Sequence, residues 1–220
     1  MTTTQERKAQ DRQARRRKIQ DAARTVFADR GYAGSSIEQI ARASQLSVGA
    51  IYLYFRSKED LYVSLIEDAL TVFDVEFNQL RTTADVALRL PKAWAALLAW
   101  AARDAEGPRV LRLLAQPGVR AQLSDDVATT AAAQLDKVQQ HFAAMIADGN
   151  AAGIYRDAAP APFATLVWSL FLGVLDAVQI DQNLANVAGD GEALADRGNR
   201  ALQALEGALG LPRAAVRVVA

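Results

Sequence analysis

The stretch SVGAIYLYFRSKEDL, residues 47–61, holds the side chains best suited to bind phosphate groups. Tyr52 and Tyr54 carry hydroxyl groups, and Lys58 follows Ser57 at an expected helix start, where backbone amides also attract anions. Seen along a helix, Ile51 shares one side with the phenylalanine at position 55, which we expect to be buried. Tyr52 and the neighbouring leucine then turn toward solvent, and Tyr54 lies at the edge. The chemistry that this predicts is noncovalent contact with a phosphate backbone.

The same stretch has a plainer interpretation, and it lacks one expected feature. Exposed tyrosines and short helical turns occur in many all-α proteins, so the pattern alone leaves DNA binding and an ordinary surface equally open. No Arg, Asn or Gln lies between Ser47 and Phe55. Base recognition would therefore depend on contact of Ala50 or Leu53 with thymine methyl groups, on DNA shape, and on groups outside the third helix. Those groups are Arg56, Gln39 and the basic N-terminal arm.

Two helices are expected to position this stretch. A first helix is predicted by an apolar stripe at helical spacing and ends at Arg30-Gly31; the stripe is Ile19, Ala22, Ala23, Val26 and Phe27. Ser35 and Glu38 form an S-x-x-E capping box, which predicts the start of a short second helix. A four-residue turn then leads to a third helix at about 48–55. This rhythm is typical of a helix-turn-helix.

The rest of the chain also follows a helical period. A long fourth helix is predicted from 58 to about 80, and others at about 84–104, 108–115, 121–149, 161–182 and 190–209, with a kink or break at Pro91. The predicted fold class is all-α, with about nine helices.

Composition places limits on partners and compartment. Residues 1–60 hold 12 Lys and Arg against 7 Asp and Glu, whereas residues 61–220 hold 13 against 18, so a basic module precedes an acidic body. There is no cysteine, and the polar N-terminus lacks the apolar run of a signal peptide. No run of about 18 uninterrupted apolar residues occurs, so no membrane span is predicted. We expect a cytoplasmic protein.

Residues 61–220 carry no recognisable catalytic motif. The single histidine, His141, has no nearby carboxylate cluster in the sequence, and we expect a surface or partly packed helix residue. No HExxH, GxSxG or glycine-rich phosphate loop is present. The prediction is that the protein is not an enzyme and has no catalytic residues, cofactor or metal site.

Residues 15–62 resemble the DNA-binding domain of the TetR family of bacterial transcriptional regulators. The matching positions are Phe27, Gly31, Tyr32, Ser35, Ser36, Ile37, Ile40, Ala41, Gly49, Tyr52, Tyr54, Phe55, Ser57, Lys58, Glu59 and Leu61. Two positions depart from the family pattern. Gln45 stands where glycine is usual in the turn, and Ala50 stands where threonine is common. The resemblance covers about the first quarter of the chain.

The resemblance implies a division of roles in the DNA-binding domain. It implies phosphate contacts from Ser36, Tyr52, Tyr54 and Lys58, and entry into the major groove by Val48, Gly49, Ala50 and Leu53. Ser47, just before the third helix, is also expected to bind DNA. Gln39 and Arg42 are expected to assist. The predicted domains are a flexible basic arm at 1–12 that reaches a neighbouring minor groove, the DNA-binding domain at 13–73 with its helix-turn-helix at about 38–57, and a helical effector-binding and dimerisation domain at 74–220.

For the larger domain the resemblance implies an effector pocket and a dimer interface. Apolar side chains are expected to line the pocket, which favours a small hydrophobic effector; they are Trp94, Leu98, Trp100, Phe142, Met145 and Phe163. The helix at 161–182 is apolar over more than half of its circumference, which exceeds one core-facing stripe. The expected four-helix dimer interface comprises Leu166, Leu170, Gly173, Val174, Ala177, Ala201, Leu202 and Leu205.

The function expected from these features is that of a homodimeric regulator of transcription. It would act as a repressor that a small hydrophobic ligand releases from a palindromic operator, with the long fourth helix as the lever between the two domains. The alternative is an all-α interaction protein whose basic N-terminal end binds an acidic partner or a membrane surface.

Overall fold

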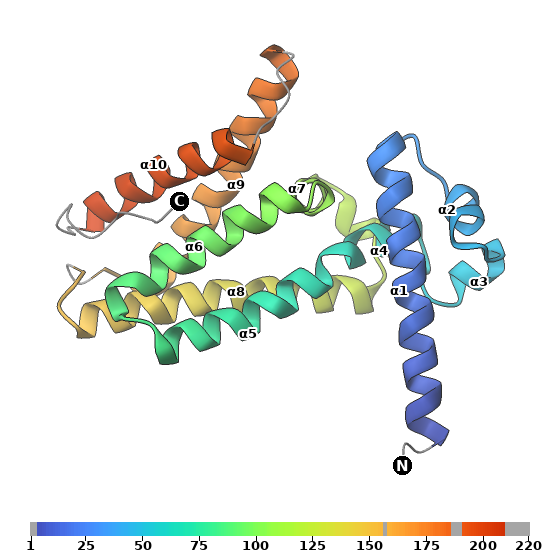
Figure 1. Ribbon diagram of the computed structural model, residues 1–220, viewed down its shortest axis with the longest axis horizontal. Helices are drawn as coiled ribbons and strands as arrows, with labels where there is room; N and C mark the ends of the chain where they lie inside the picture. Colours follow the sequence, from blue (N-terminus) through green and yellow to red (C-terminus); the bar gives the residue numbers. More distant parts are fainter. Residues whose placement is uncertain (1–3, 156–157, 186–190, 210–220) are drawn as a thin grey trace. The chain divides into compact units, whose positions relative to one another are not determined.

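The computed structural model describes residues 4–155, 158–185 and 191–209, and all regular structure in these ranges is helical (Figure 1). The elements are α1 Thr4–Arg30, α2 Ile37–Ser44, α3 Val48–Tyr52, α4 Lys58–Val63, η1 Ser64–Ile66, α5 Glu67–Thr83, α6 Val86–Arg103, α7 Glu106–Leu114, η2 Val119–Gln122, α8 Asp125–Ala151, α9 Pro160–Ala185 and α10 Gly191–Leu209. The predicted all-α fold is confirmed. Pro91 lies inside α6 without ending it.

The chain divides into two compact units. The head unit comprises Met1–Glu67 and Ala105–Ala131, and the body unit comprises Asp68–Asp104 and Ala132–Ala220. The division differs from the predicted boundary after residue 73, because α7 and η2 belong with the helix-turn-helix. Two contacts explain this difference. The buried Tyr62 hydroxyl donates to Glu106 Oε2 at 2.9 Å, and the Ser124 amide donates to Asp60 Oδ1 at 2.9 Å.

α1 is much longer than its apolar stripe. Residues 4–12, which we expected to form a flexible arm, continue the helix, so that expectation is wrong for them. The reason is local, since Thr4–Arg30 contains neither Gly nor Pro and is rich in the strong helix formers Ala, Arg, Lys and Gln. The predicted end is confirmed: Gly31 has φ 69° and its amide donates to the Phe27 carbonyl oxygen at 2.8 Å.

The long fourth helix is interrupted, which corrects the prediction of one continuous lever. α4 and α5 are separated by the 3-10 turn η1. Gln20 Nε2 on α1 donates to both Ser64 O and Ser64 Oγ at 3.0 Å, and the Arg24 guanidinium donates to the Leu65 carbonyl oxygen. The Ser64 hydroxyl in turn donates to Leu61 O at 2.7 Å. These side chains compete for carbonyl groups that a continuous α-helix would use, and the turn tightens.

Aromatic rings hold the centre of the body unit together. Between ring centroids, Phe73 on α5 lies 5.6 Å from Trp100 of α6 and 5.4 Å from Phe77. The Phe77 centroid lies 5.5 Å from that of Phe142 on α8. In Figure 1 these three helices run alongside one another. Trp94 is fully buried and connects α6 to α10, since its indole Nε1 donates to the Gly198 carbonyl oxygen at 3.1 Å.

His141 is a packed helix residue, as predicted. Its Nε2 lies 2.8 Å from Asp74 Oδ1, and its ring meets Phe77 edge-on. The hydrogen bond from His141, together with that from Lys137, lowers the pKa of Asp74. The pair therefore joins α5 to α8 as a structural contact.

One segment of α9, Pro160–Asn183, is long and apolar enough to cross a membrane by length and composition alone. No membrane span is predicted from the sequence, because Ser169, Asp176 and Gln179 interrupt the apolar run. Side chains on one face of this helix are buried within the body unit, among them Val167 and Phe171. The apolar window is 33% buried, so this helix packs on one face and leaves apolar side chains such as Leu166 and Ile180 exposed.

Glu206, on α10, is a buried acid that the sequence did not indicate. It is 4% exposed, and its Oε1 has no hydrogen-bond partner in the described part of the chain. Burial raises the pKa of Glu206 to about 7. The native carboxyl therefore holds its proton more tightly than the unfolded one, so its stabilising contribution is complete at low pH. That contribution is lost as the pH rises from the unfolded pKa through about 7.

We expect Glu206→Gln to remove this pH dependence. The variant should unfold with a free energy about 2–3 kcal/mol above that of the wild type at pH 8, and with no gain at pH 4. Urea unfolding at both pH values measures the difference. Asp196→Asn, at an exposed position on the same helix, is the control and should show little change. Equal pH profiles for wild type and Glu206→Gln would contradict the assignment.

Candidate nucleic-acid interface

Two serines and one left-handed residue shape the helix-turn-helix. Ser36 Oγ caps α2 by accepting from the Gln39 amide at 3.4 Å, and Gln39 Oε1 accepts from the Ser36 amide at 3.0 Å. The capping box thus lies one residue beyond the predicted Ser35 and Glu38. Ser35 is instead buried, and its hydroxyl donates to the Gly31 carbonyl oxygen at 2.6 Å. Ser47 caps α3 by accepting from the Ala50 amide at 3.1 Å.

Gln45, in the turn, adopts the left-handed conformation that glycine usually supplies. Its φ is 56° and ψ is 42°, and it is the sole non-glycine residue with positive φ among those described. A residue with a Cβ atom pays about 1 kcal/mol or more for this conformation. Gln45 therefore keeps the backbone conformation of the usual glycine, at the cost of local backbone strain.

We expect Gln45→Gly to raise the free energy of unfolding by about 0.5–1 kcal/mol, because glycine adopts this conformation without strain. Chemical denaturation measures the change. Ala43→Gly is the matched control: it places glycine inside α2 and should lower stability by a similar amount. A loss of stability in both variants would show that Gln45 is not strained.

The aromatic residues around α3 divide between core and surface as predicted. Ile51 and Phe55 are buried, whereas Tyr52 is 50% exposed and Leu53 is 75% exposed. Tyr54 is half-buried. The exposed face of α3 therefore ends in a tyrosine and a leucine, next to side chains no larger than valine.

The other residues of α3 form a smooth surface. Gly49 is exposed, and a Cβ atom placed there would meet nothing within 4 Å. Val48 and Ala50 are partly exposed. Another molecule can approach this surface closely, which suits a helix that enters a DNA groove.

Lys58 is bound more firmly than its predicted phosphate role requires. Its Nζ donates to the Tyr32 carbonyl oxygen at 3.0 Å and to the Ser35 carbonyl oxygen at 3.2 Å, and it lies 4.2 Å from the centre of the Tyr32 ring. Two of its three donors are thus engaged. Ser57 caps α4 as predicted, by accepting from the Asp60 amide at 2.9 Å.

The predicted helper residues of α2 lie in different settings. Arg42 is exposed. Gln39 is half-buried, and its carbonyl oxygen is occupied by the capping box, which leaves its amide NH₂ group for other contacts.

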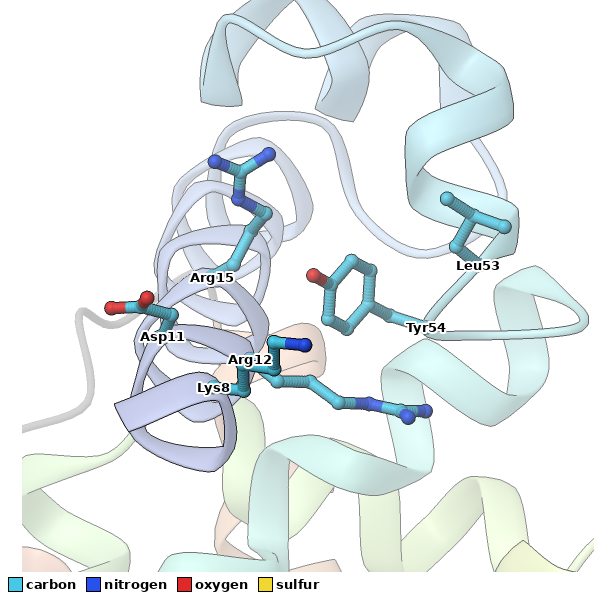
Figure 2. Close-up of a pocket in the computed structure, with 6 residues that line it drawn as sticks. All are labelled: Lys8, Asp11, Arg12, Arg15, Leu53 and Tyr54. Carbon is cyan, nitrogen blue, oxygen red and sulfur yellow. The ribbon is translucent and has the colours of Figure 1, made fainter. Parts of the chain in front are cut away.

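A basic cleft lies between α1 and the end of α3. Its volume is about 440 Å³, and its lining residues are Lys8, Asp11, Arg12, Arg15, Leu53 and Tyr54 (Figure 2). The Arg12 guanidinium carbon lies 5.9 Å from the centre of the Tyr54 ring. The sequence predicts a flexible arm for Lys8 and Arg12, and it does not place any of the three cations beside Tyr54. Their spacing of three and four residues on a helix was the signal available.

Arg16, on the same helix, has a structural role. Its NH1 donates to Glu67 Oε2 at 2.7 Å and its NH2 donates to Glu67 Oε1 at 3.0 Å, a bidentate pair, and the guanidinium lies over the Phe55 ring. It ties α1 to the start of α5, so it is not an open charge for DNA.

The side chains proposed for an effector pocket all lie in the body unit but in three settings. Trp94 and Leu98 face Gly198 of α10, where a Cβ atom would lie 2.5 Å from Leu98 Cδ1. Trp100 and Phe142 belong to the aromatic cluster that also contains Phe73 and Phe77. Met145 is fully buried on α8, and Phe163 is half-buried near the start of α9.

The side chains proposed for a dimer interface also divide. Val174, Leu202 and Leu205 are buried inside the body unit, so assigning them to contact with a second subunit is corrected. They face inward because α10 packs against both α6 and α9. The other five proposed positions are exposed or partly exposed; they are Leu166, Leu170, Gly173, Ala177 and Ala201.

Comparisons with known proteins agree with this geometry. Residues 19–65 match the family described as bacterial regulatory proteins, tetR family. The chain is 28% identical over 195 residues to the HTH-type transcriptional repressor SCO4008 of Streptomyces coelicolor, which covers 86% of this chain and 91% of that protein. It is 30% identical over 148 residues to the HTH-type transcriptional activator FasR of Mycolicibacterium smegmatis, covering 63% of this chain and 68% of FasR.

Solved structures share the fold. The fatty acid degradation regulator FadR from Bacillus halodurans superposes with a TM-score of 0.64 over 87% of this chain and 98% of its own, at 24% identity. FadR from Bacillus subtilis, solved in complex with stearoyl-CoA, also superposes with a TM-score of 0.64, over 86% of this chain and 96% of its own, at 22% identity. None of these similarities favours an all-α interaction protein of another class. The chain belongs to the TetR family of bacterial transcriptional regulators, and it is a DNA-binding regulator of transcription.

Proposed function

We propose that this regulator is a cytoplasmic homodimer that represses transcription from a palindromic operator and is released by a small hydrophobic effector. DNA binding is assigned to the head unit, and dimerisation and effector binding to the body unit. The observation that carries the proposal is the solvent-facing end of α3, where Tyr52 and Leu53 stand exposed beside small residues. Large exposed side chains on a short helix have no packing role within the subunit.

In this proposal α3 reads the major groove with few polar groups. Val48, Gly49, Ala50 and Leu53 meet base edges through apolar contacts, and Leu53 is the large apolar side chain of this surface with the greater exposed fraction, 75%. Ser47 bounds the helix, and the hydroxyls of Ser36, Tyr52 and Tyr54 contact phosphates. Lys58 acts mainly by holding the Tyr32–Ser35 loop, with one donor left for a phosphate.

Dimerisation is supported by an apolar face of α9. Leu166 is 48% exposed and Ile180 is 55% exposed, and between them Leu170, Gly173 and Ala177 follow at spacings of three and four residues. Such a face is covered when a second copy of the helix packs on it. A two-fold symmetric dimer presents two copies of α3, which matches a palindromic site.

A hydrophobic effector is supported by the aromatic cluster of the body unit. Trp100 is buried, and its indole Nε1 has no hydrogen-bond partner in the described ranges of the chain. A buried, unpaired donor beside Phe73 suits an apolar molecule that carries one hydrogen-bond acceptor. B. subtilis FadR, which shares this fold, was solved with stearoyl-CoA, a ligand that includes a long apolar chain.

Repression is supported by SCO4008, which aligns over 86% of this chain and 91% of its own and is named a repressor. FasR, also a relative, is named an activator. In the proposed mechanism the effector shifts the equilibrium toward a conformation whose two α3 helices no longer fit successive major grooves.

The test begins with selection of duplexes by the full-length protein from a random-sequence library. We expect an enriched palindrome, and a screen of apolar compounds should give molecules that raise the melting temperature and release that duplex. Transcription in vitro from a promoter carrying the palindrome should fall when the protein is added and recover with an active compound. Failure to enrich any sequence would overturn the proposal, and a rise in transcription would replace repression by activation.

A further inference from the structure

The basic cleft next to α3 has the composition of an anion site. Lys8, Arg12 and Arg15 recur at spacings of four and three residues, which places them on one face of α1. Three cations stand against one carboxylate, Asp11, which points away from Tyr54 in Figure 2. The cleft therefore has a net positive charge.

These cations differ from their neighbour Arg16 in having no fixed partner. Arg16 is held by the Glu67 carboxylate, whereas no ion pair within the described ranges engages Lys8, Arg12 or Arg15. Arg12 rests near the Tyr54 ring, at a centroid distance of 5.9 Å. Exposed cations with no protein partner can be transferred to an anionic ligand without breaking a salt bridge.

The place of the cleft identifies the anion. Leu53 lines it, and the same side chain ends the exposed face of α3. A helix lying in a major groove about 12 Å wide has a phosphate strand along each side. The cleft adjoins one end of α3, and in Figure 2 the Tyr54 hydroxyl points toward α1 between Arg12 and Arg15. In Figure 2 the guanidinium groups of Arg12 and Arg15 extend to different sides of the Tyr54 ring, so these exposed side chains would turn toward a phosphate bound beside the hydroxyl.

We propose that the N-terminal turns of α1 form a rigid second DNA-binding element that clamps the phosphate strand beside α3 in this cleft. This inference rests on the proposed function, because it needs α3 in the major groove. Under this proposal the N-terminal part of α1 is not a flexible arm in the minor groove. It is a helix that holds the DNA strand next to the exposed face of α3. Charge-assisted contacts fix the register of α3 on the duplex, which suits a reading helix that lacks polar side chains.

Single substitutions on opposite faces of α1 provide the test. Arg12→Ala and Arg15→Ala remove cleft cations. Arg17→Ala removes the same charge from an exposed position on the opposite face, five residues from Arg12 and two from Arg15, where a helix of 100° per residue points away from the cleft. Alanine preserves helix propensity, and circular dichroism of each variant checks that α1 is intact.

The measurement is fluorescence anisotropy with the palindromic duplex that the wild type selects, across a series of salt concentrations. Arg12→Ala and Arg15→Ala are each expected to weaken binding about 5- to 20-fold and to reduce the slope of log K against log salt by about 0.9, the value for one lost phosphate contact. Arg17→Ala should weaken binding less than about 2-fold.

The outcomes separate the two proposals. If the wild type enriches a palindrome but all three variants bind it equally, the clamp is refuted and the proposed function stands. If no duplex is enriched, the proposed function itself fails. If the cleft variants lose binding to vesicles of anionic phospholipid and keep full binding to the duplex, the cleft serves a lipid surface and the clamp is likewise refuted.

Discussion

Replacing Leu53 by glutamate is expected to weaken binding of the selected palindrome by at least about 100-fold and to leave the melting temperature of the free protein unchanged. The side chain is 75% exposed at the end of α3, so the subunit tolerates a carboxylate there. On DNA the same carboxylate enters a groove bordered by phosphates, and like charges brought together cost several kcal/mol. A loss of about 2.7 kcal/mol corresponds to a factor of 100.

Val72→Glu is the matched control for this variant. Val72 is 58% exposed on α5 in the body unit, and the substitution changes the net charge by the same amount. It should change DNA affinity by no more than a small factor. Equal losses in Leu53→Glu and Val72→Glu would mean that net charge, and not the surface of α3, controls binding.

The milder variant Leu53→Ala tests how bases are read. If the leucine contacts a thymine methyl group, its truncation should lower the preference for one base pair in each half-site, by roughly 5- to 30-fold, with little change in the salt dependence. Repeating the library selection with the variant measures this directly. An unchanged enriched sequence would remove Leu53 from base recognition.

Introducing glutamate at Leu166 is the second change with a large expected effect. The side chain is half-exposed on the apolar face of α9, where a partner subunit would bury it. An unpaired carboxylate in such an interface is strongly unfavourable, so the variant should sediment as a monomer. Because one head unit then binds without the other, affinity for the palindrome should fall by about 100-fold or more.

Ala133→Glu is the control for the dimer variant. Ala133 is exposed on α8, and the substitution adds the same charge as Leu166→Glu. It should remain a dimer with full DNA affinity. Ile180→Glu, at the other end of the apolar face, should behave like the Leu166 variant. If both α9 variants have the sedimentation coefficient of the wild-type dimer, the dimer forms through another surface.

Local patterns in the sequence were sufficient for the fold class and for the sides of α3. Ile51 and Phe55 lie on the predicted inner side, and the end of α1 at Gly31 follows from a glycine in the left-handed conformation. These features depend on helical periodicity and on single-residue backbone preferences, which act over a few residues. Near misses have the same origin: Ser35 and Ser36 are both good caps, and burial of Ser35 decided between them.

Contacts between distant segments decided the rest. The break between α4 and α5 depends on Gln20, which donates to Ser64 from 44 residues away. Arg12 and Arg16 look alike in the sequence, yet only Arg16 lies close enough to Glu67 to form an ion pair with it.

Residue type and spacing decide which side of a helix is apolar, so the sequence was enough to predict an all-helical chain whose third helix turns Tyr52 and Leu53 toward solvent. Only the tertiary structure showed which exposed cations have no protein partner and stand beside Tyr54. The physical reason is that the neutralisation of a charge depends on distance in space, which separation along the chain does not define.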